Sequence, residues 1–218
     1  MQLRLHRFLP KTSVEGPGAR ACLWVQGCSI RCPGCFNPGT WGASGGQVVE
    51  VDDLLEKIIT TSGIDGVTFL GGEPFDQAPP LSALAQSVQD AGLSVMTFSG
   101  YEYDTLRRDQ RPGWDELLAA TDLLVDGPFV RSLPDSKRPW VGSTNQQFRF
   151  LTSRYHHLSD ELGSIPDRLE VRLRPDGTVF INGMASPAVL NDLESAVGRR
   201  QRQPNDRSLV PKAASALG

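Results

Sequence analysis

The 218-residue sequence lacks the features that would place it in a membrane or in a secreted, disulfide-bonded protein. No apolar run approaches the ~20 residues that a membrane-spanning helix needs. The first ten residues alternate apolar with basic or polar side chains and contain no apolar core of signal-peptide length. Only four cysteines are present, three of them clustered, which is a poor basis for a disulfide framework. We therefore expect a protein of the reducing cytoplasm.

The sequence also has little of what nucleic-acid binding or hydrolytic catalysis requires. Its net charge is −3, so there is no excess of positive charge to attract nucleic acid. It has three histidines and no recognisable Ser/His/Asp or Cys/His arrangement. A hydrophobic fraction of 39% with 22% charged residues is ordinary for a globular protein, and the length suffices for one real core.

What the sequence does contain is a cluster of three cysteines, Cys28, Cys32 and Cys35, spaced C-x3-C-x2-C. Thiolates are soft ligands, and three in one loop can converge on a single inorganic centre. Zinc usually takes a fourth protein ligand, and the only other cysteine, Cys22, lies on an expected buried strand. A four-iron cluster held by three cysteines explains the count better and leaves one iron free for a small molecule. A zinc site that uses Cys22 and a ferredoxin-type electron carrier remain as alternatives.

A second motif, Gly71-Gly72-Glu73-Pro74, ends a short apolar strand that starts at Gly66. Two glycines remove side-chain bulk, so that backbone groups at the strand end can approach a ligand closely. The Glu73 carboxylate can add negative charge near a ligand's ammonium group, and Pro74 stiffens the exit of the chain. These residue types favour a ligand-binding site at the end of the strand.

Strand and helix patterns alternate between residues 21 and 125. This alternation predicts βαβ units around a parallel sheet, with functional residues at the carboxyl ends of the strands. Besides the glycine motif, the residues at such ends are Ser99, Gly100 and Asp126; the last could equally cap a turn. The expected strands are 21–26, 66–70, 93–98 and 122–125, and the expected helices are 51–60, 78–91 and 114–120.

The second half of the sequence is less regular. Residues 127–146 have no clear periodicity, and a loop of this length in a compact domain is usually functional or disordered. A strand is expected at 147–151 and a hairpin at 168–181. We expect a core domain over residues 1–185 and, over 186–218, a last helix followed by a mobile arginine-containing tail.

The cysteine spacing, after an apolar run and beside an aromatic residue, resembles the radical S-adenosylmethionine (SAM) superfamily. The three clustered cysteines match its cluster ligands. Most members place the aromatic residue just before the third cysteine, whereas this chain has Gly34 there and Phe36 just after. That variant resembles the activating enzymes of anaerobic ribonucleotide reductase, as do the segments 15–20 (Glu-Gly-Pro-Gly-Ala-Arg) and 142–146 (Gly-Ser-Thr-Asn-Gln).

The resemblance implies an α/β fold, namely an incomplete (β/α)6-type partial barrel with a parallel sheet and helices outside. It implies a 4Fe-4S cluster on Cys28, Cys32 and Cys35, and SAM that an electron cleaves to methionine and a 5′-deoxyadenosyl radical. The cofactor-binding residues it implies are Gly34, Phe36, Gly71, Gly72, Glu73, Pro74, Ser99, Gly100 and Asp126.

The resemblance also implies partners. The radical would take hydrogen from a glycine of a glycyl-radical enzyme, and the electron would come from a flavodoxin or ferredoxin-type donor. No nucleic acid or membrane is expected. Two alternatives remain, a radical-SAM enzyme that acts on a small metabolite or peptide natural product, and an iron–sulfur electron carrier without SAM.

Overall fold

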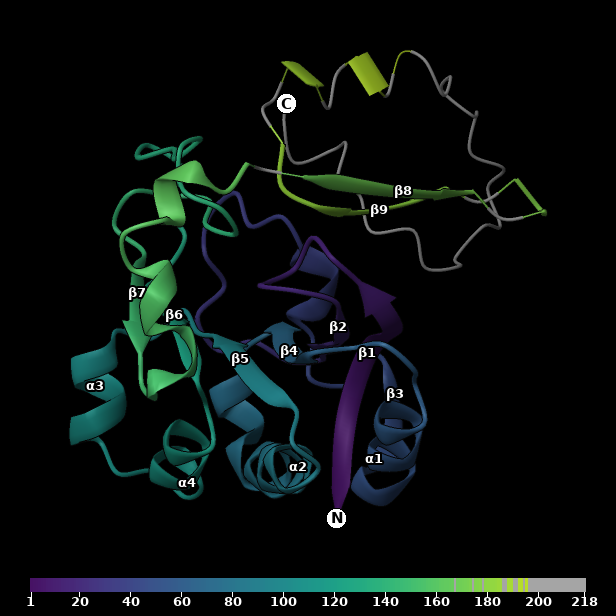
Figure 1. Cartoon of the computed structure of the whole chain (residues 1–218), viewed down its shortest axis with the longest axis vertical. Coiled ribbons are helices and arrows are strands. Elements are labelled where there is room, and N and C mark those ends of the chain that lie inside the picture. The colour runs from purple at the N-terminus through teal and green to yellow at the C-terminus, as the bar shows by residue number, and fades with distance from the viewer. Residues whose placement is uncertain are drawn as a thin grey trace.

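In the computed structural model, a seven-stranded sheet runs through the protein and helices cover one of its faces (Figure 1). The structure describes residues 1–166, 168–173, 175–177, 179–185, 188–189, 192–193 and 195. The strand order is β3-β1-β2-β4-β5-β6-β7. The strands are β1 (Gln2–Thr12), β2 (Arg20–Val25), β3 (Gln47–Glu50), β4 (Gly66–Gly71), β5 (Ser94–Phe98), β6 (Leu123–Asp126) and β7 (Gln147–Phe150).

Four α-helices and several short 3-10 turns connect these strands. The helices are α1 (Val51–Ile59), α2 (Ala78–Asp90), α3 (Tyr103–Arg108) and α4 (Trp114–Ala119). The 3-10 turns are η1 (Pro38–Thr40), η2 (Pro74–Gln77), η3 (Ser153–Leu158) and η4 (Leu162–Ser164). None of the helices in the described part of the chain is long and apolar enough to cross a membrane.

The four central strands, β2, β4, β5 and β6, are parallel to one another, which confirms the predicted α/β fold. The parallel sheet expected for residues 21–125 forms the centre of a larger mixed sheet, because β1, β3 and β7 all pair antiparallel to their neighbours. The reason lies in the connections. A parallel strand needs a crossover, usually a helix, whereas β7 follows the helix-free segment 127–146 and runs back beside β6.

The central strands are buried on both faces, as parallel strands between two layers usually are. All six residues of β2 are buried. Leu23 and Val25 pack with the helices in the larger hydrophobic core, to which α2 contributes its buried stripe of Leu81, Leu84 and Val88. A smaller core on the other face covers β5 and β6 with side chains from residues 141–158. That second layer leaves the ends of β2 and β4 uncovered on this face.

A bulge in β1 decides which side chain reaches that uncovered face. Side chains on a strand alternate, so Leu5 and Arg7 would normally share a face. The register slips between them: Leu5 pairs with Val25, whereas Arg7 pairs with Trp24. The extra residue turns the Arg7 guanidinium over the Trp24 ring, 3.8 Å from its centroid. A cation is thereby placed on the face opposite the helices.

Most predicted elements are present, with a few additions. Strand β3 and helix α3 were not predicted; β3 is short, and α3 is six residues long. The predicted hairpin is confirmed as a separate two-stranded sheet, β8 (Leu169–Leu173) with β9 (Val179–Gly183), lying across the top of Figure 1. The predicted last helix and the tail lie largely outside the described residues.

Candidate iron–sulfur and cofactor pocket

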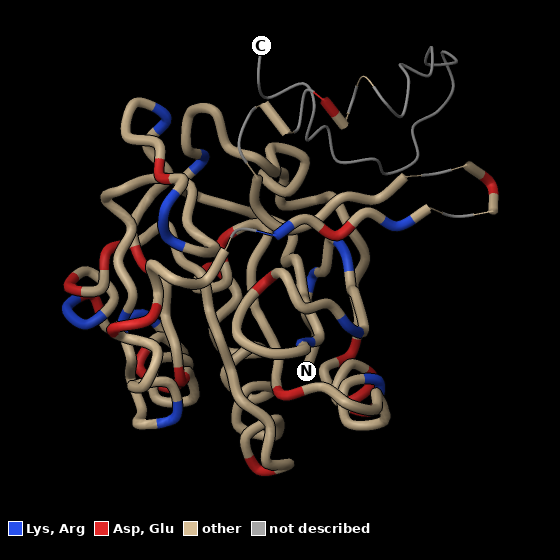
Figure 2. Tube along the Cα trace, turned by 45° about the horizontal axis from the view of Figure 1, so that its top comes forward, with Lys and Arg blue, Asp and Glu red and all other residues tan. Residues whose placement is uncertain are grey.

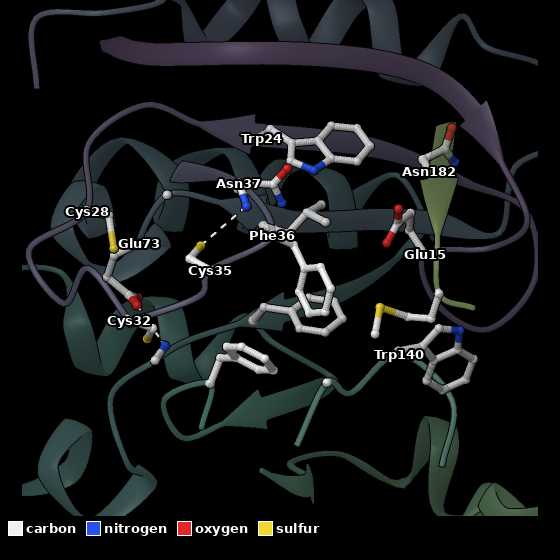
Figure 3. Close-up of a pocket in the computed structure, with 18 of the residues that line it drawn as sticks. Glu15, Trp24, Cys28, Cys32, Cys35, Phe36, Asn37, Glu73, Trp140 and Asn182 are labelled. Carbon is white, nitrogen blue, oxygen red and sulfur yellow. Dashed lines mark hydrogen bonds between the residues drawn. The ribbon is translucent and has the colours of Figure 1, made fainter. Parts of the chain in front are cut away.

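A pocket of about 260 Å³ opens where β2, β4 and β5 end, on the face opposite the helices (Figure 3). Figure 3 shows Cys28, Cys32 and Cys35 on one side of the pocket and Glu15 with Asn182 on the other. The carboxyl ends of parallel strands meet at one sheet edge, which is where ligands of α/β proteins usually bind. The pocket thus lies where the strand pattern placed the functional residues.

The three clustered cysteines line this pocket together, each only partly exposed. Their loop leaves β2 and is fixed by backbone hydrogen bonds, Gly27 N to Thr40 O (2.7 Å) and Cys35 N to Cys32 O (3.1 Å). The Asn37 amide donates to Cys35 Sγ at 3.3 Å, and amide donors of this kind tune iron–sulfur clusters. Burial raises the pKa of the Cys28 and Cys32 thiols, whose deprotonation a bound metal would favour.

The fourth cysteine stands apart from this group. Cys22 is fully buried on β2, does not line the pocket, and has a thiol pKa that burial raises. Among the described residues, no three His, Cys, Asp or Glu side chains are close enough together to hold a single metal ion. Because Cys22 is buried away from the pocket, it does not supply the fourth ligand that the zinc alternative required. The three thiols that do line the pocket suit an iron–sulfur cluster.

The two glycines at the end of β4 allow two strand ends to approach each other. Gly71 has φ +105°, and a Cβ there would lie 2.6 Å from the Cα of Trp24. A Cβ on Gly72 would lie 2.1 Å from the carbonyl oxygen of Gly27. The Gly72 amide donates to Val25 O and the Glu73 amide to Gly27 O, both at 2.9 Å. The missing side chains make room for β2 and the cysteine loop. That these glycines also let a ligand approach closely stays a prediction.

Glu73 connects the end of β4 to the end of β5. Its carboxylate is 1% exposed and accepts hydrogen bonds from the Phe75 amide (2.9 Å), the Ser99 hydroxyl (2.9 Å) and the Gly100 amide (2.8 Å). Burial raises the pKa of Glu73 to about 7, although these three donors favour the carboxylate. Glu73, Ser99 and Gly100 all line the pocket. The carboxylate orders two strand ends as well as facing the cavity.

Of the other predicted site residues, Phe36, Gly71 and Gly72 also line the pocket, whereas Gly34, Pro74 and Asp126 do not. Gly34 lies against the side chain of Arg131. Pro74 is buried at the start of η2. Asp126 is 2% exposed and accepts hydrogen bonds from the Tyr103 amide and Arg149 Nε, both at 2.8 Å.

Comparisons with known proteins agree with this site. Residues 14–149 match the family described as a 4Fe-4S single cluster domain. The anaerobic ribonucleoside-triphosphate reductase-activating protein of Salmonella typhimurium is 34% identical over 152 residues, 66% of this chain and 96% of that protein. The protein of the same name from Escherichia coli K12 is 32% identical over the same shares. The pyruvate formate-lyase-activating enzyme of Clostridium pasteurianum is 33% identical over 129 residues, 56% of this chain and 50% of that enzyme.

The chain belongs to the radical-SAM family of glycyl-radical activating proteins. Its cofactors are accordingly a 4Fe-4S cluster and SAM. The residues present fit a cluster with SAM beside it. Three thiols line one end of the pocket, and the rest of the pocket has space and polar side chains for a second ligand. Trp41 lines the same pocket, and its buried indole N–H has no hydrogen-bond partner in the described protein, so it is available to a ligand.

Of the aromatic wall of this activase pocket, sequence reasoning predicted Phe36 but missed Phe129 and Trp140. The rings of Phe36 and Phe129 lie 5.1 Å apart, and a Cβ on Gly142 would come within 3.0 Å of Phe129. Gly142 and Trp140 belong to the segment 127–146, which the sequence marked only as a long irregular loop. The sequence feature that could have pointed to this part of the wall is the resemblance of residues 142–146 to the family's Gly-Ser-x-Asn-Gln stretch. The segment packs against the cysteine loop and forms part of the pocket wall.

The polar end of the pocket, away from the cysteines, was also missed. Glu15 lines it and accepts a hydrogen bond of 2.8 Å from the Gly183 amide of β9. Burial raises the pKa of Glu15 to about 7, while that amide and the charge of Arg7 pull the pKa down. Arg7 and Glu15 lie near the start of the chain and Asn182 lies near residue 180, and no local pattern in the sequence links them.

Proposed function

We propose that this chain generates a glycyl radical on a partner enzyme. Its relatives are named as activators of anaerobic ribonucleoside-triphosphate reductase and of pyruvate formate-lyase, which supports the proposal. When bound, the cluster and SAM supply a 5′-deoxyadenosyl radical, which abstracts a hydrogen atom. The observation that carries the proposal is the gathering of three cysteines and three strand ends around one open pocket in a chain of this family. We propose that the protein acts in the cytoplasm, where thiols stay reduced.

In this proposal Cys28, Cys32 and Cys35 hold the cluster, and the ends of β4 and β5 hold SAM. Backbone groups of Gly71, Gly72 and Gly100, with Glu73, Ser99 and the ring of Phe36, orient the cofactor and exclude water from it. Gly34, Pro74 and Asp126 act behind these residues, by shaping the cysteine loop and the strand ends.

We propose further that the parallel strands and their helices correspond to a shortened (β/α)6-type partial barrel. The support is that the pocket lies at the carboxyl ends of β2, β4 and β5, as barrel sites do. In that reading the core domain ends at residue 185, since β9 and the two residues after it still contribute to the pocket wall.

The electron donor we propose is an acidic flavodoxin or ferredoxin-type protein that docks beside the cysteine loop. Arg31 and Arg131 are exposed there, and Arg131 lies against Gly34, between two of the cysteines. Neither arginine forms an ion pair within the described residues. Arg31 also has φ +52°, a conformation that side-chain-bearing residues seldom keep without reason. Two such cations suit an acidic partner.

The proposal is tested with anaerobically reconstituted protein, dithionite, SAM and the anaerobic ribonucleotide reductase of the same organism. We expect 5′-deoxyadenosine and a glycyl-radical doublet in the EPR spectrum. Cys32→Ala should lose both together with cluster iron, whereas Cys22→Ala, the matched buried thiol, should keep both. Turnover that survives Cys32→Ala would refute the cluster ligands. 5′-Deoxyadenosine without any radical on the reductase would favour a small-molecule or peptide substrate.

A further inference from the structure

The β8–β9 hairpin is attached to the protein by its polar side, the reverse of a usual amphipathic hairpin. The polar residues Glu170, Arg172 and Asn182 share one face with Phe180, because Glu170 pairs with Asn182, Arg172 pairs with Phe180 and the side chains alternate along each strand. All three face β1: Glu170 and Asn182 hydrogen-bond to the Thr12 hydroxyl, and Arg172 to the Lys11 carbonyl. Arg172 also pairs with Glu170 at 2.6 Å.

The opposite face of the hairpin is therefore apolar and is turned away from β1. Its side chains are Leu169, Val171, Leu173, Val179 and Ile181. Leu169 and Ile181 line the pocket. Val171 and Leu173, further along β8, are 39% and 72% exposed. One continuous apolar strip thus runs from the pocket wall to the surface; we call these five residues the hairpin face.

The hairpin face lies outside the part of the chain that matches the family. The family match ends at residue 149, and β8 begins at Leu169. The hairpin nevertheless forms part of the pocket wall, next to Glu15, whose carboxylate accepts the Gly183 amide. Whatever enters the pocket from this side passes along a surface that lies beyond the residues matched by the family model.

We propose that the hairpin face is a docking surface for the protein substrate, and that it binds an aliphatic segment next to the glycine that enters the pocket. This inference rests on the proposed function. A small molecule held within the pocket would not extend to Leu173 at the exposed end of the strip, whereas a polypeptide that delivers one glycine must lie across the surface on its way in. Contiguous exposed apolar patches often mark interaction sites, and the hairpin face continues the apolar wall of the pocket.

The test compares Val171→Ser/Leu173→Ser with Val48→Ser/Ile59→Ser, a matched pair of exposed aliphatic residues (48% and 52%) on β3 and α1. The probe is the anaerobic ribonucleotide reductase of the same organism, and the readouts are its Kd and the yield of glycyl radical. We expect the hairpin variant to weaken binding at least tenfold, with radical yield recovering at high reductase concentration. 5′-Deoxyadenosine formed without the reductase should be unchanged, and the control pair should bind normally.

Several results would overturn the inference. An unchanged Kd would do so, as would equal weakening by the control pair. If the unaltered chain self-associates and the variant does not, the face belongs to a second copy. If a chain ending at residue 195 binds the reductase more tightly, the face belongs to the chain's own C-terminal residues. The single variant Leu173→Ser keeps the test valid should the double variant fold poorly. Failure of the unaltered chain to form any radical on the reductase would overturn the proposed function as well.

Discussion

At the scale of single residues, Asp126 shows how hydrogen bonds within the protein can use both oxygens of a carboxylate at a strand end. It is buried, and both of its oxygens accept charged or backbone donors, Arg149 Nε and the Tyr103 amide. The sequence left two readings of Asp126 equally open, a site residue or a turn cap. Its hydrogen bonds show a third role, because they tie the end of β6 to the start of α3 and to β7.

Asp126→Asn provides the corresponding prediction. An amide oxygen can accept from one of the two donors but leaves a cation or a buried amide poorly paired, so unfolding free energy should fall by about 1–3 kcal/mol. SAM affinity should stay within about twofold of the unaltered protein, because Asp126 does not line the pocket. Denaturant unfolding and calorimetric SAM titration check this. A large loss of SAM affinity at unchanged stability would show that Asp126 takes part in cofactor binding.

Glu15 leads to a prediction about pH. Its folded pKa of about 7 lies above the ordinary value of 4.5. Between these two pH values the folded chain keeps a proton that the unfolded chain releases, so this group's contribution to stability falls as pH rises. The side chain of the Glu15→Gln variant is neutral at every pH. The free energy of unfolding of this variant, relative to that of the unaltered protein, should therefore rise by up to about 3 kcal/mol between pH 4.5 and pH 7. Anaerobic denaturant unfolding at several pH values measures the difference. A pH-independent difference would contradict the raised pKa.

At the scale of elements, the ends of β2 and β4 are joined so closely that they work as one support for the pocket. The Gly72 and Glu73 amides donate to β2 and to the cysteine loop, and Glu73 in turn holds the end of β5. Gly100 continues the contact, since a Cβ there would lie 2.7 Å from Ile30 of the cysteine loop. Movement of any of these strand ends would move the cysteines.

Gly72→Ala tests this support. The added Cβ would meet the Gly27 carbonyl oxygen at 2.1 Å, so the backbone must shift. We expect a loss of at least about 2 kcal/mol in stability and weaker retention of cluster iron. Gly42→Ala is the control, because nothing lies within 4 Å of a Cβ at that position. Thermal unfolding and iron analysis are the measurements; equal behaviour of the two variants would show that the strand ends are not coupled.

At the scale of the whole molecule, charges of both signs are interspersed along the chain (Figure 2). With a net charge of −3, no overall field attracts or repels a partner strongly. In our proposals, recognition of partners depends on local surfaces, namely the hairpin face at one end of the pocket and the two arginines beside the cysteine loop.

Charge reversal tests the arginine surface. Arg31→Glu and Arg131→Glu should each slow cluster reduction by an acidic flavodoxin about tenfold at low salt and lessen its salt dependence. Reduction by dithionite should be unchanged, because a small reductant needs no docking surface. Lys57→Glu on α1 is the charge-matched control, exposed on the helix side. Equal slowing with dithionite would mean that the substitutions damaged the cluster site instead.

Much of this protein follows from local sequence. The spacing of Cys28, Cys32 and Cys35, the Gly-Gly-Glu-Pro turn and the alternation of strands and helices predicted the parallel core, the cluster chemistry and the edge of the sheet where the pocket lies. These features were predictable because each depends on residues close together in the chain. Strand and helix periods, turn glycines and ligand spacing are all local properties.

Only the tertiary structure decided the rest. It turned Arg7 onto Trp24 through a bulge, placed Glu15 against β9, and brought the aromatic side chains of 127–146 to the cysteine loop. It also paired Asp126 with Arg149 and turned the polar side of the hairpin toward β1. Each of these features depends on contacts between residues far apart in the chain. The free energy of such contacts depends on which surfaces pack together in the folded protein, and a local sequence pattern does not contain that information.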